Sequence, residues 1–259
     1  FKKANYISLL DVCVGMGYNS ACIIEKLIKG SIPLEWWGLE IDKRPMQIGI
    51  SNPIFKSIWS DEVQRILTCI QENGYWKHEI SKGEIIWGDA RQKLDSIPKE
   101  VRFDLILLDP FSPSKCPSLW SEEFLSKVTK KLASGGRLIT YSTAAAIRGS
   151  LRRSGLYVAS QVPFNDPRRN WSSGTIAIST NEEFNKDVQE IHWKPLSKME
   201  EEHLLTKAAV PYRDPHGNSN NEDILKRRRI EQQLCDLEIT SQEKTMAEDV
   251  LGLQPLDFV

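Results

Sequence analysis

Hydrophobic and polar residues alternate in blocks along the first two thirds of the chain, and these blocks predict strands and helices in turn. Apolar runs of strand length occupy residues 7–14, 35–41, 84–87 and 103–108. The first run leads into a glycine turn and then into a helical pattern over residues 21–28. Strands that stay apolar on both faces and alternate with helices are typical of a parallel sheet covered on both sides. The pattern predicts an α/β domain.

Two further features extend this pattern. A fifth strand is expected at residues 137–141, after a helix closed by Gly135 and Gly136. Residues 55–81 form a helical insertion between the second and third strands, and a helix over residues 61–71 is expected there because its apolar residues recur at helical spacing. Those apolar residues are Val63, Ile66, Leu67 and Ile70.

The chain divides into two regions by composition. Residues 1–180 carry the alternating pattern and are expected to form one domain. Residues 181–259 are polar, with one helical pattern and little periodicity towards the end, so we expect a partly helical extension that is disordered at its end.

Acidic side chains stand where the expected strands end. Glu40 and Asp42 close the second strand, Asp89 follows the third and Asp109 follows the fourth. Charges gather at the carboxyl ends of parallel strands where a ligand needs them. Each acid alone has a simpler interpretation as the N-cap of the next helix, and Asp42 fits that role better than Glu40 does.

Asp109 opens a proline-rich loop, DPFSPSKCPSLW, at the end of an apolar strand. One carboxylate beside one aromatic side chain at the rim of a sheet suits a planar or amine-bearing substrate. The alternative is that Asp109 only caps the turn before Pro110. At the first strand, Gly15 and Gly17 allow a backbone to approach a nucleotide, but Ser20 stands where the dinucleotide fingerprint continues with a third glycine, so that match is weak.

The order of motifs resembles a known family. LLDVCVGMGYN, WGLEID, WGDA, LLDPF and LASGGRLITYS are similar to the successive motifs of class I S-adenosyl-L-methionine (SAM) methyltransferases. The loop DPFSPSKCPSLW, with LITYSTAAAIRGSLRRSGL and RRNWSSGTIAIS, resembles the methyltransferase half of MnmC and its stand-alone relatives, which methylate a modified wobble uridine in tRNA. The later AVPYRDP resembles the C-terminal end of the stand-alone members. The resemblance implies a Rossmann-like, mostly parallel seven-stranded sheet with helices on both faces, followed by a C-terminal extension.

The resemblance also assigns roles to residues of this chain. Glu40 would accept the ribose hydroxyls of SAM, and Asp89 with the backbone of Ala90 would face the adenine. Asp109 would stand next to the methyl group and the incoming nucleophile. The methionine part of SAM would lie against Gly15, Gly17, Tyr18 and Asn19, and the substrate pocket would be shaped by Phe111, Pro113 and Trp120.

The implied substrate is an aliphatic primary amine, which is mostly protonated at neutral pH. Freeing its lone pair costs about 4 kcal/mol, from roughly three pKa units. Asp109 is therefore best interpreted as proton acceptor and aligner together. No metal is expected, because SAM supplies the electrophile and the four histidines have no ligand spacing.

Charge limits where RNA could bind. The formal net charge of −1 excludes a protein coated in positive charge, so RNA would need a local patch. We favour one group of arginines as phosphate contacts: Arg148, Arg152, Arg153, Arg168 and Arg169. The run Lys226-Arg227-Arg228-Arg229 is interpreted instead as a solvated helix face.

Cysteine usage and hydropathy bear on location. Five cysteines without a CxxC pair are typical of reduced thiols rather than a disulfide framework. No apolar run reaches the length of a membrane span and the start has no secretory pattern, so a cytoplasmic location is expected.

The leading hypothesis is a SAM-dependent N-methyltransferase that converts 5-aminomethyl uridine, with or without a 2-thio group, to 5-methylaminomethyl uridine at the tRNA wobble position. No flavin-binding fold follows residue 179, so the aminomethyl form would be received directly or from a separate enzyme. Relatives carry a segment ahead of the first strand, whereas this chain begins at Phe1, so the pocket is expected to be incomplete if the chain is a fragment. The alternatives are a small-molecule amine methyltransferase, an aminopropyltransferase on the same fold, and a non-catalytic RNA-binding module.

Overall fold

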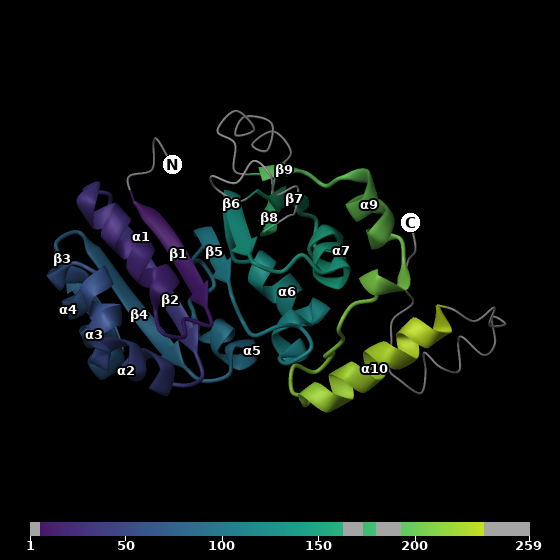
Figure 1. The fold of residues 1–259 in the computed structure, drawn as a ribbon, viewed down its shortest axis with the longest axis horizontal. Coiled ribbons are helices and arrows are strands. Elements are labelled where there is room, and N and C mark those ends of the chain that lie inside the picture. Colours follow the sequence, from purple (N-terminus) through teal and green to yellow (C-terminus); the bar gives the residue numbers. More distant parts are fainter. Residues whose placement is uncertain (1–5, 163–172, 180–192, 236–259) are drawn as a thin grey trace.

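One sheet organises the molecule, and its described strands have the order β3-β4-β2-β1-β5-β6-β8-β7-β9 (Figure 1). The structure is a computed structural model that describes residues 6–162, 173–179 and 193–235. The central strands pair in parallel, β4 with β2, β2 with β1, β1 with β5 and β5 with β6. Their bounds are Ile7–Val12 (β1), Leu34–Glu40 (β2), Ser81–Trp87 (β4), Phe103–Leu108 (β5) and Leu132–Thr140 (β6).

Four antiparallel pairings complete the sheet. β8 (Gly174–Ile178) lies between β6 and β7 (Tyr157–Gln161), and β7 also pairs with β9 (Trp193–Pro195). At the opposite edge β3 (Tyr75–His78) pairs with β4. The described sheet therefore has nine strands where seven were expected. The two additional strands lie at the edges, because β3 comes from the insertion and β9 from the extension, and neither segment shows strand periodicity.

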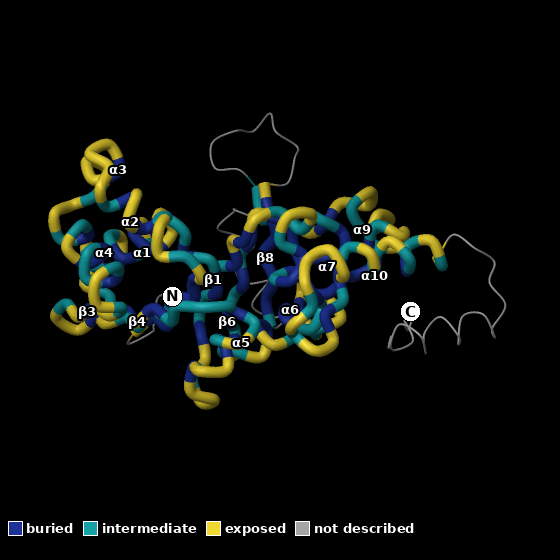
Figure 2. The backbone as a smooth tube through the Cα atoms, turned by 90° about the horizontal axis from the view of Figure 1, so that it is seen from below, coloured by how far each residue is buried: buried dark blue, intermediate teal, exposed yellow. Residues whose placement is uncertain are grey.

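Helices cover both faces of the sheet, which explains the doubly apolar strands. Along β1, Ile7 and Leu9 belong to one core cluster, whereas Leu10 and Val12 belong to the other. Figure 2 shows the central strands buried and the outer sides of the helices exposed. The first cluster packs against α1 (Tyr18–Lys29), α2 (Arg44–Ser51), α3 (Pro53–Ile58) and α4 (Asp61–Asn73); the second packs against α5 (Ala90–Lys93), α6 (Glu122–Thr129) and α7 (Ala145–Arg153).

The insertion is helical up to Asn73, as expected, and then forms β3, which was not expected. The helix expected over residues 61–71 is α4, and Val63, Ile66, Leu67 and Ile70 are its buried residues. It ends at Gly74, whose φ of +79° is a conformation that side chains other than glycine rarely adopt.

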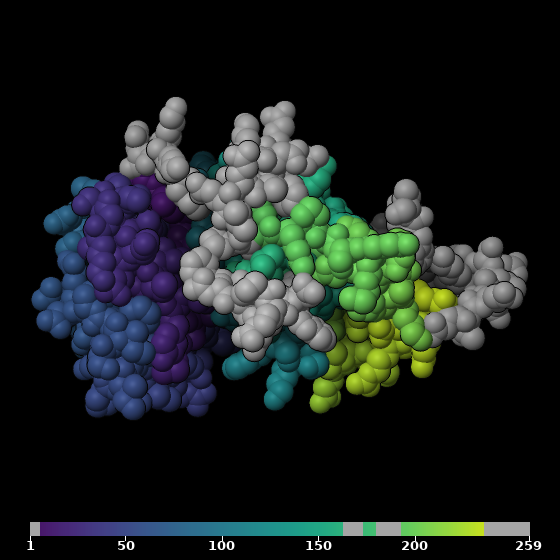
Figure 3. All heavy atoms as spheres, turned by 45° about the horizontal axis from the view of Figure 1, so that its top comes forward, coloured from purple at the N-terminus to yellow at the C-terminus, as the bar shows by residue number. Residues whose placement is uncertain are grey.

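The described part of the extension packs onto the same sheet. Figure 3 shows its segments, green to yellow, beside the teal part of the chain and away from the purple α1. α9 (Lys198–Leu204) lies against α7, and α10 (Asn221–Leu234) contributes the fully buried Ile224 to the second core cluster. Tyr212 also joins that cluster and forms a bridge with Ser121 at the start of α6. The end of the extension, for which disorder was expected, lies outside the described residues.

The buried carboxyl of Glu231 on α10 is expected to lower the stability of the fold at neutral pH. Its side chain is buried, and burial raises the pKa of its carboxyl to about 7, although Arg213 and Arg227 act in the opposite direction. Because the folded-state pKa lies above the unfolded value of 4.5, folding loses stability as pH rises from about 4.5 to about 7. We expect Glu231→Leu to raise the free energy of unfolding by about 1–3 kcal/mol at pH 8 and by much less at pH 4.5. Urea unfolding at both pH values measures this.

The exposed Glu222 on the same helix provides the control. Glu222→Gln should leave the difference between the two pH values unchanged. An equal stabilisation of Glu231→Leu at both pH values would contradict a raised pKa for Glu231.

Candidate active site

The carboxyl ends of the parallel strands meet at one edge of the sheet. Val12 of β1 is in register with Leu39 of β2 and with Leu108 of β5, and Glu40 is in register with Trp87 of β4. The loops that carry the predicted site residues therefore start within about one residue of the same level. This edge brings together the segments that the sequence singled out separately.

The turn after β1 is held against the end of β2. The N–H of Gly15 donates to Oε2 of Glu40 at 2.9 Å, while Oε1 of Glu40 accepts from the N–H groups of Ile41 (2.7 Å) and Asp42 (2.9 Å). Three backbone donors thus fix a carboxylate that is 8% exposed. Gly15 has a φ of +57°, and a Cβ there would meet only the Cys13 carbonyl oxygen, at 4.0 Å. The turn is open enough for a ligand to reach its backbone.

Asp42 was expected to cap α2, but the N-cap position is held by Lys43, and Asp42 lies one residue before it. Its Oδ1 accepts from the N–H of Arg44 at 2.9 Å, and its carboxylate pairs with the Arg44 guanidinium. These bonds hold Asp42 at the start of α2 and leave Glu40 as the acceptor beside the glycine turn.

Asp109 contacts the first turn of α1. Nδ2 of Asn19 donates to Oδ2 of Asp109 at 3.0 Å, and the N–H of Asp109 donates to the carbonyl of Val12 at 3.2 Å. Asp109 is exposed. One carboxylate oxygen is therefore oriented by Asn19, and the other has no hydrogen bond to any residue described, so it can accept a proton or a donor from a ligand.

Aromatic residues frame the loop that follows Asp109. Phe111 is 81% exposed, and its carbonyl accepts from Nε1 of Trp120 at 2.7 Å. Pro113 is partly buried in the same loop. Trp120 is 0% exposed, so the prediction that it lines the substrate pocket is wrong. Its ring fills the core and its N–H anchors the loop instead.

Tyr141 is a candidate that the sequence reasoning missed. Its hydroxyl donates to the carbonyl of Pro110 at 2.9 Å, and its ring packs edge-on against Trp120 with centroids 6.0 Å apart. The ring is nevertheless 45% exposed. Burial and the nearby Asp109 carboxylate raise the pKa of Tyr141, which keeps its hydroxyl neutral. An aromatic residue directly after the last parallel strand was the available signal.

Tyr18 lies at the other side of the glycine turn. Its ring contacts Phe55 and Trp59 of the insertion, with centroid distances of 4.8 and 6.0 Å. Tyr18 thus joins the turn after β1 to α3, and its predicted contact with a cofactor stays a prediction.

A buried carboxyl lies beneath this edge. Asp11 of β1 is 0% exposed and accepts from the Ser20 hydroxyl at 2.5 Å, and Ser20 accepts in turn from Nε1 of Trp36. Burial raises the pKa of Asp11 to about 7; the Ser20 bond opposes the rise, while the charges of Asp109 and Glu40 add to it. Asp11, a polar residue within the apolar first strand, is therefore buried in the core and hydrogen-bonded through Oδ2.

Asp89 begins α5 and is engaged by one neighbour. Its Oδ1 accepts from the N–H of Arg91 at 2.9 Å, and the Arg91 guanidinium spans both oxygens with a shortest distance of 2.7 Å. Three N–H groups of Arg91 make four contacts with this carboxylate, because Nε lies 3.2 Å from Oδ1 and 3.1 Å from Oδ2, and the side chain is 26% exposed. An amine can therefore still reach Asp89, and the backbone of Ala90 lies beside it.

The arginines predicted to contact RNA have other partners. Arg148 is 2% exposed and donates to Thr175, Ser160 and Glu200, so it cannot reach a phosphate and that prediction is wrong. Arg152 pairs with Glu201 at 2.6 Å and Arg153 pairs with Glu122, both near the surface. The proposed contact of Arg152 and Arg153 with RNA stays a prediction. Arg168 and Arg169 lie outside the described residues.

The basic run of α10 is only in part a solvated face. Lys226 and Arg229 are exposed, but Arg227 donates to the carbonyl of Arg213 and Arg228 to that of Val210, each at 2.8 Å. Two of its four cations therefore tie α10 to the preceding segment.

Comparison with known proteins places this geometry in a family. Residues 53–175 match the family described as S-adenosyl-L-methionine-dependent methyltransferase. The chain is 27% identical over 174 residues to the tRNA 5-methylaminomethyl-2-thiouridine biosynthesis bifunctional protein MnmC of Campylobacter hominis. The crystal structure of MnmC2 from Aquifex aeolicus matches with a TM-score of 0.71 and 22% identity, over 90% of this chain and 70% of that one. These matches support a SAM-dependent methyltransferase that is similar to MnmC.

The alignment with the Campylobacter hominis protein covers a larger share of this chain than of that relative. It spans 64% of this chain but 25% of the Campylobacter hominis protein. An uncharacterized protein of Methanocaldococcus jannaschii, MJ0670, is 25% identical over 80% of this chain and 54% of its own length. The chain thus spans from a quarter to about half of these two relatives.

SAM is the cofactor of this family, and the site of the MnmC-like chain fits it. The open backbone at Gly15, the fixed carboxylate of Glu40 and the partly exposed carboxylate of Asp89 lie at neighbouring strand ends, where they would face the methionine, ribose and adenine parts of SAM. Within the described residues no group of three or more His, Cys, Asp or Glu could hold a metal ion. No helix among them is long and apolar enough to cross a membrane.

Proposed function

We propose that this MnmC-like enzyme transfers a methyl group from SAM to the 5-aminomethyl nitrogen of a tRNA wobble uridine, with or without a 2-thio group. The observation that carries the proposal is the carboxylate of Asp109, whose Oδ2 accepts from Nδ2 of Asn19 at 3.0 Å. It lies between the glycine turn after β1 and the exposed Phe111. Several relatives are named tRNA 5-methylaminomethyl-2-thiouridine biosynthesis bifunctional protein MnmC, which supports tRNA as the substrate.

Asp109 and Asn19 have different roles in the proposed reaction. When bound, SAM supplies an electrophilic methyl group on sulfur. The substrate arrives mostly as an ammonium, and the free oxygen of Asp109 accepts its proton so that the nitrogen lone pair is available. Gly15, Glu40 and Asp89 would hold SAM so that its methyl group passes to the nitrogen while the electron pair of its S–C bond stays on sulfur, and the transfer balances. Asn19 keeps the carboxylate in place, which lowers the entropic cost of alignment.

Phe111 and Tyr141 present planar faces beside Asp109, and a uracil ring is planar. Exposed aromatic side chains stack unpaired bases, typically with about 1–3 kcal/mol per base. The hydroxyl of Tyr141 ties its ring to the loop through Pro110. Tyr141 would therefore act as a positioning residue for the base.

A single assay tests the function. The protein, SAM carrying a labelled methyl group and bulk tRNA from cells lacking the final wobble methylation are incubated, and the tRNA is digested to nucleosides. Label in 5-methylaminomethyl uridine or its 2-thio form is the expected result. Label in free amines, with none in tRNA, would instead assign a small-molecule amine methyltransferase. SAM binding without transfer to either substrate would contradict the proposal.

Two variants of Tyr141 distinguish the contribution of its ring from that of its hydrogen bond to Pro110. Tyr141→Leu removes the stacking face and is expected to raise KM for tRNA about tenfold, from roughly 1–3 kcal/mol of stacking, with a smaller change in kcat. Tyr141→Phe keeps the face and loses only the bond to Pro110, so its KM should rise no more than about threefold. Steady-state kinetics with saturating SAM measure both constants.

Equal KM values for the leucine variant and the unmodified protein would contradict a stacking role. Tyr157→Leu is a suitable control, because Tyr157 is also 45% exposed but lies at the start of β7. The other end of β7 is the one near the site, since Ser160 pairs with Thr175 and Thr175 pairs with Thr140, next to Tyr141.

A further inference from the structure

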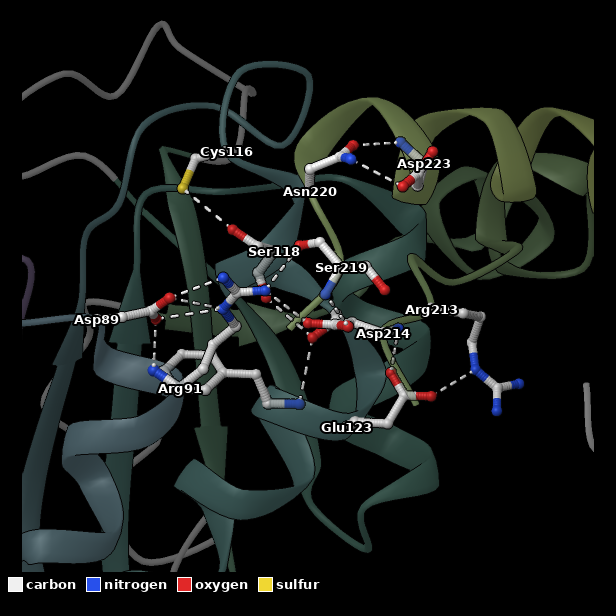
Figure 4. A network of polar contacts seen from close by, with 12 residues as sticks. Asp89, Arg91, Cys116, Ser118, Glu123, Arg213, Asp214, Ser219, Asn220 and Asp223 are labelled. Carbon is white, nitrogen blue, oxygen red and sulfur yellow. Dashed lines mark hydrogen bonds and ion pairs between the residues drawn. The ribbon is translucent and has the colours of Figure 1, made fainter. Parts of the chain in front are cut away.

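A chain of ion pairs connects the AVPYRDP segment to the loop after β4. Figure 4 shows Arg91 between two carboxylates, with Asp89 on one side and Asp214 on the other. Nη1 of Arg91 lies 2.8 Å from Oδ2 of Asp214 and also donates to the carbonyl of Ser219 at 2.9 Å. The Arg91 guanidinium is therefore held from both sides, and its rotation would break bonds to Asp89 and to Asp214, which lies 123 residues further along the chain than Arg91.

Asp214 is built as a fixed, charged partner. Its side chain is 0% exposed, and its Oδ1 accepts from the N–H of Ser219 at 3.0 Å. Burial by itself raises the pKa of Asp214, but the Ser219 and Arg91 donors outweigh it and lower the pKa. A buried carboxylate that remains ionised holds a guanidinium more firmly than a solvated one, because water competes less.

The segment around Asp214 is itself anchored to the core. Glu123 at the start of α6 accepts from the N–H of Asp214 and from Nε of Arg213, each at 2.8 Å. The N–H of Glu122 donates to the carbonyl of Tyr212 at 2.8 Å, and the Arg228 guanidinium lies over the Tyr212 ring. The rigidity of α6 and α10 therefore extends through Asp214 to Arg91.

We propose that Arg91 and Asp214 are positioning residues for the cofactor: they hold the Asp89 carboxylate in one orientation and thereby set how strongly this enzyme selects adenine. Arg91 donates to Asp89 through three N–H groups, of which Nε is shared between the two oxygens, and the Asp89 side chain stays 26% exposed, so the exocyclic amine of the purine can still reach it. An acceptor held by a second layer of hydrogen bonds discriminates better than a mobile one, because binding costs less ordering. The C-terminal segment thus belongs to the cofactor site without touching SAM.

The inference rests on the proposed placement of adenine at Asp89, but it is tested by binding alone, without RNA. Isothermal titration calorimetry gives Kd for S-adenosylhomocysteine and for its inosine analogue, which carries a carbonyl in place of the amine. The unmodified protein should prefer the adenine compound. In Asp214→Asn, which leaves Arg91 without a charged partner at that end, we expect the ratio of the two Kd values to fall about tenfold towards unity.

The ratio is independent of the folded fraction, because both ligands are titrated into the same sample. Arg91→Lys provides a second variant that keeps a cation between the carboxylates but loses the two-oxygen contact, and it should lower the ratio as well. Arg152→Gln is the matched control, since Arg152 also joins the methyltransferase part to the extension, through Glu201 on α9, and it should leave the ratio unchanged.

Two outcomes would overturn the proposal. Unchanged ratios in both Asp214→Asn and Arg91→Lys would show that the ion pairs do not position Asp89. No preference for adenine in the unmodified protein would show that Asp89 does not contact the purine. A failure of tRNA methylation, with the ratios behaving as expected, would affect only the proposed function.

Discussion

Asp109→Ala is expected to lower kcat for methyl transfer by about 10²–10⁴-fold, the usual contribution of a positioned general base. The variant removes both the proton acceptor and the partner of Asn19, whereas the bond between Gly15 and Glu40 and the contacts of Asp89 with Arg91 remain. The affinity for SAM should therefore change only a few fold. Single-turnover transfer to tRNA and calorimetric titration of SAM measure the two effects separately.

Two further variants make this test specific. Asp109→Asn retains a side-chain oxygen that Asn19 can donate to but cannot take a proton, so it should be nearly as slow as the alanine variant. Asp42→Asn changes another carboxylate at a neighbouring strand end, which accepts from the N–H of Arg44, and it should keep near-normal kcat. Normal kcat in Asp109→Asn would exclude Asp109 as the proton acceptor.

Arg148→Met is expected to reduce the free energy of unfolding by about 3–5 kcal/mol, the cost of leaving a buried ion partner unpaired. Arg148 is the buried link between α7, Thr175 of β8 and Glu200 of α9. Urea unfolding at pH 7 measures the loss. Arg152→Met, which breaks a surface pair with Glu201, should cost less than about 1 kcal/mol.

The same pair predicts a pH dependence. Burial would raise the pKa of Glu200, but hydrogen bonds from Ser197, Arg148 and Ser160 lower it to about 2. Because the folded-state pKa lies below the unfolded value of 4.5, this stabilisation is present above pH 4.5 and is lost as pH falls towards about 2. Thermal unfolding between pH 2 and 5 should show a smaller decline in Arg148→Met than in the unmodified protein. Reduced tRNA affinity with unchanged stability would contradict the structural role.

The errors at individual residues have a common origin. Arg148 looks like a surface cation in the sequence, since it belongs to a run of basic and small residues, yet α7 is covered by α9 and β8. Trp120 stands in a loop rich in proline and serine but fills the core. Sequence periodicity describes one element at a time, and it does not reveal which faces other segments will cover.

Strand ends were predicted better than side-chain partners. The choice of Glu40 over Asp42 rested on alignment to the strand end of the family that the chain resembles; the structure places Glu40 against the glycine turn and Asp42 just before α2. By contrast, nothing local indicates that Arg91 joins Asp89 to Asp214. That contact depends on how α6 and α10 hold residues 210–214.

By itself the sequence determined the α/β class, the succession of the central strands and the acids at their ends, because alternating hydrophobicity and strand-end chemistry are local properties of the chain. Only the tertiary structure decided the two edge strands, the burial of Arg148 and the ion pairs that reach Asp89 from the C-terminal segment. Those features depend on contacts between residues far apart in the chain, whose formation is set by packing as a whole.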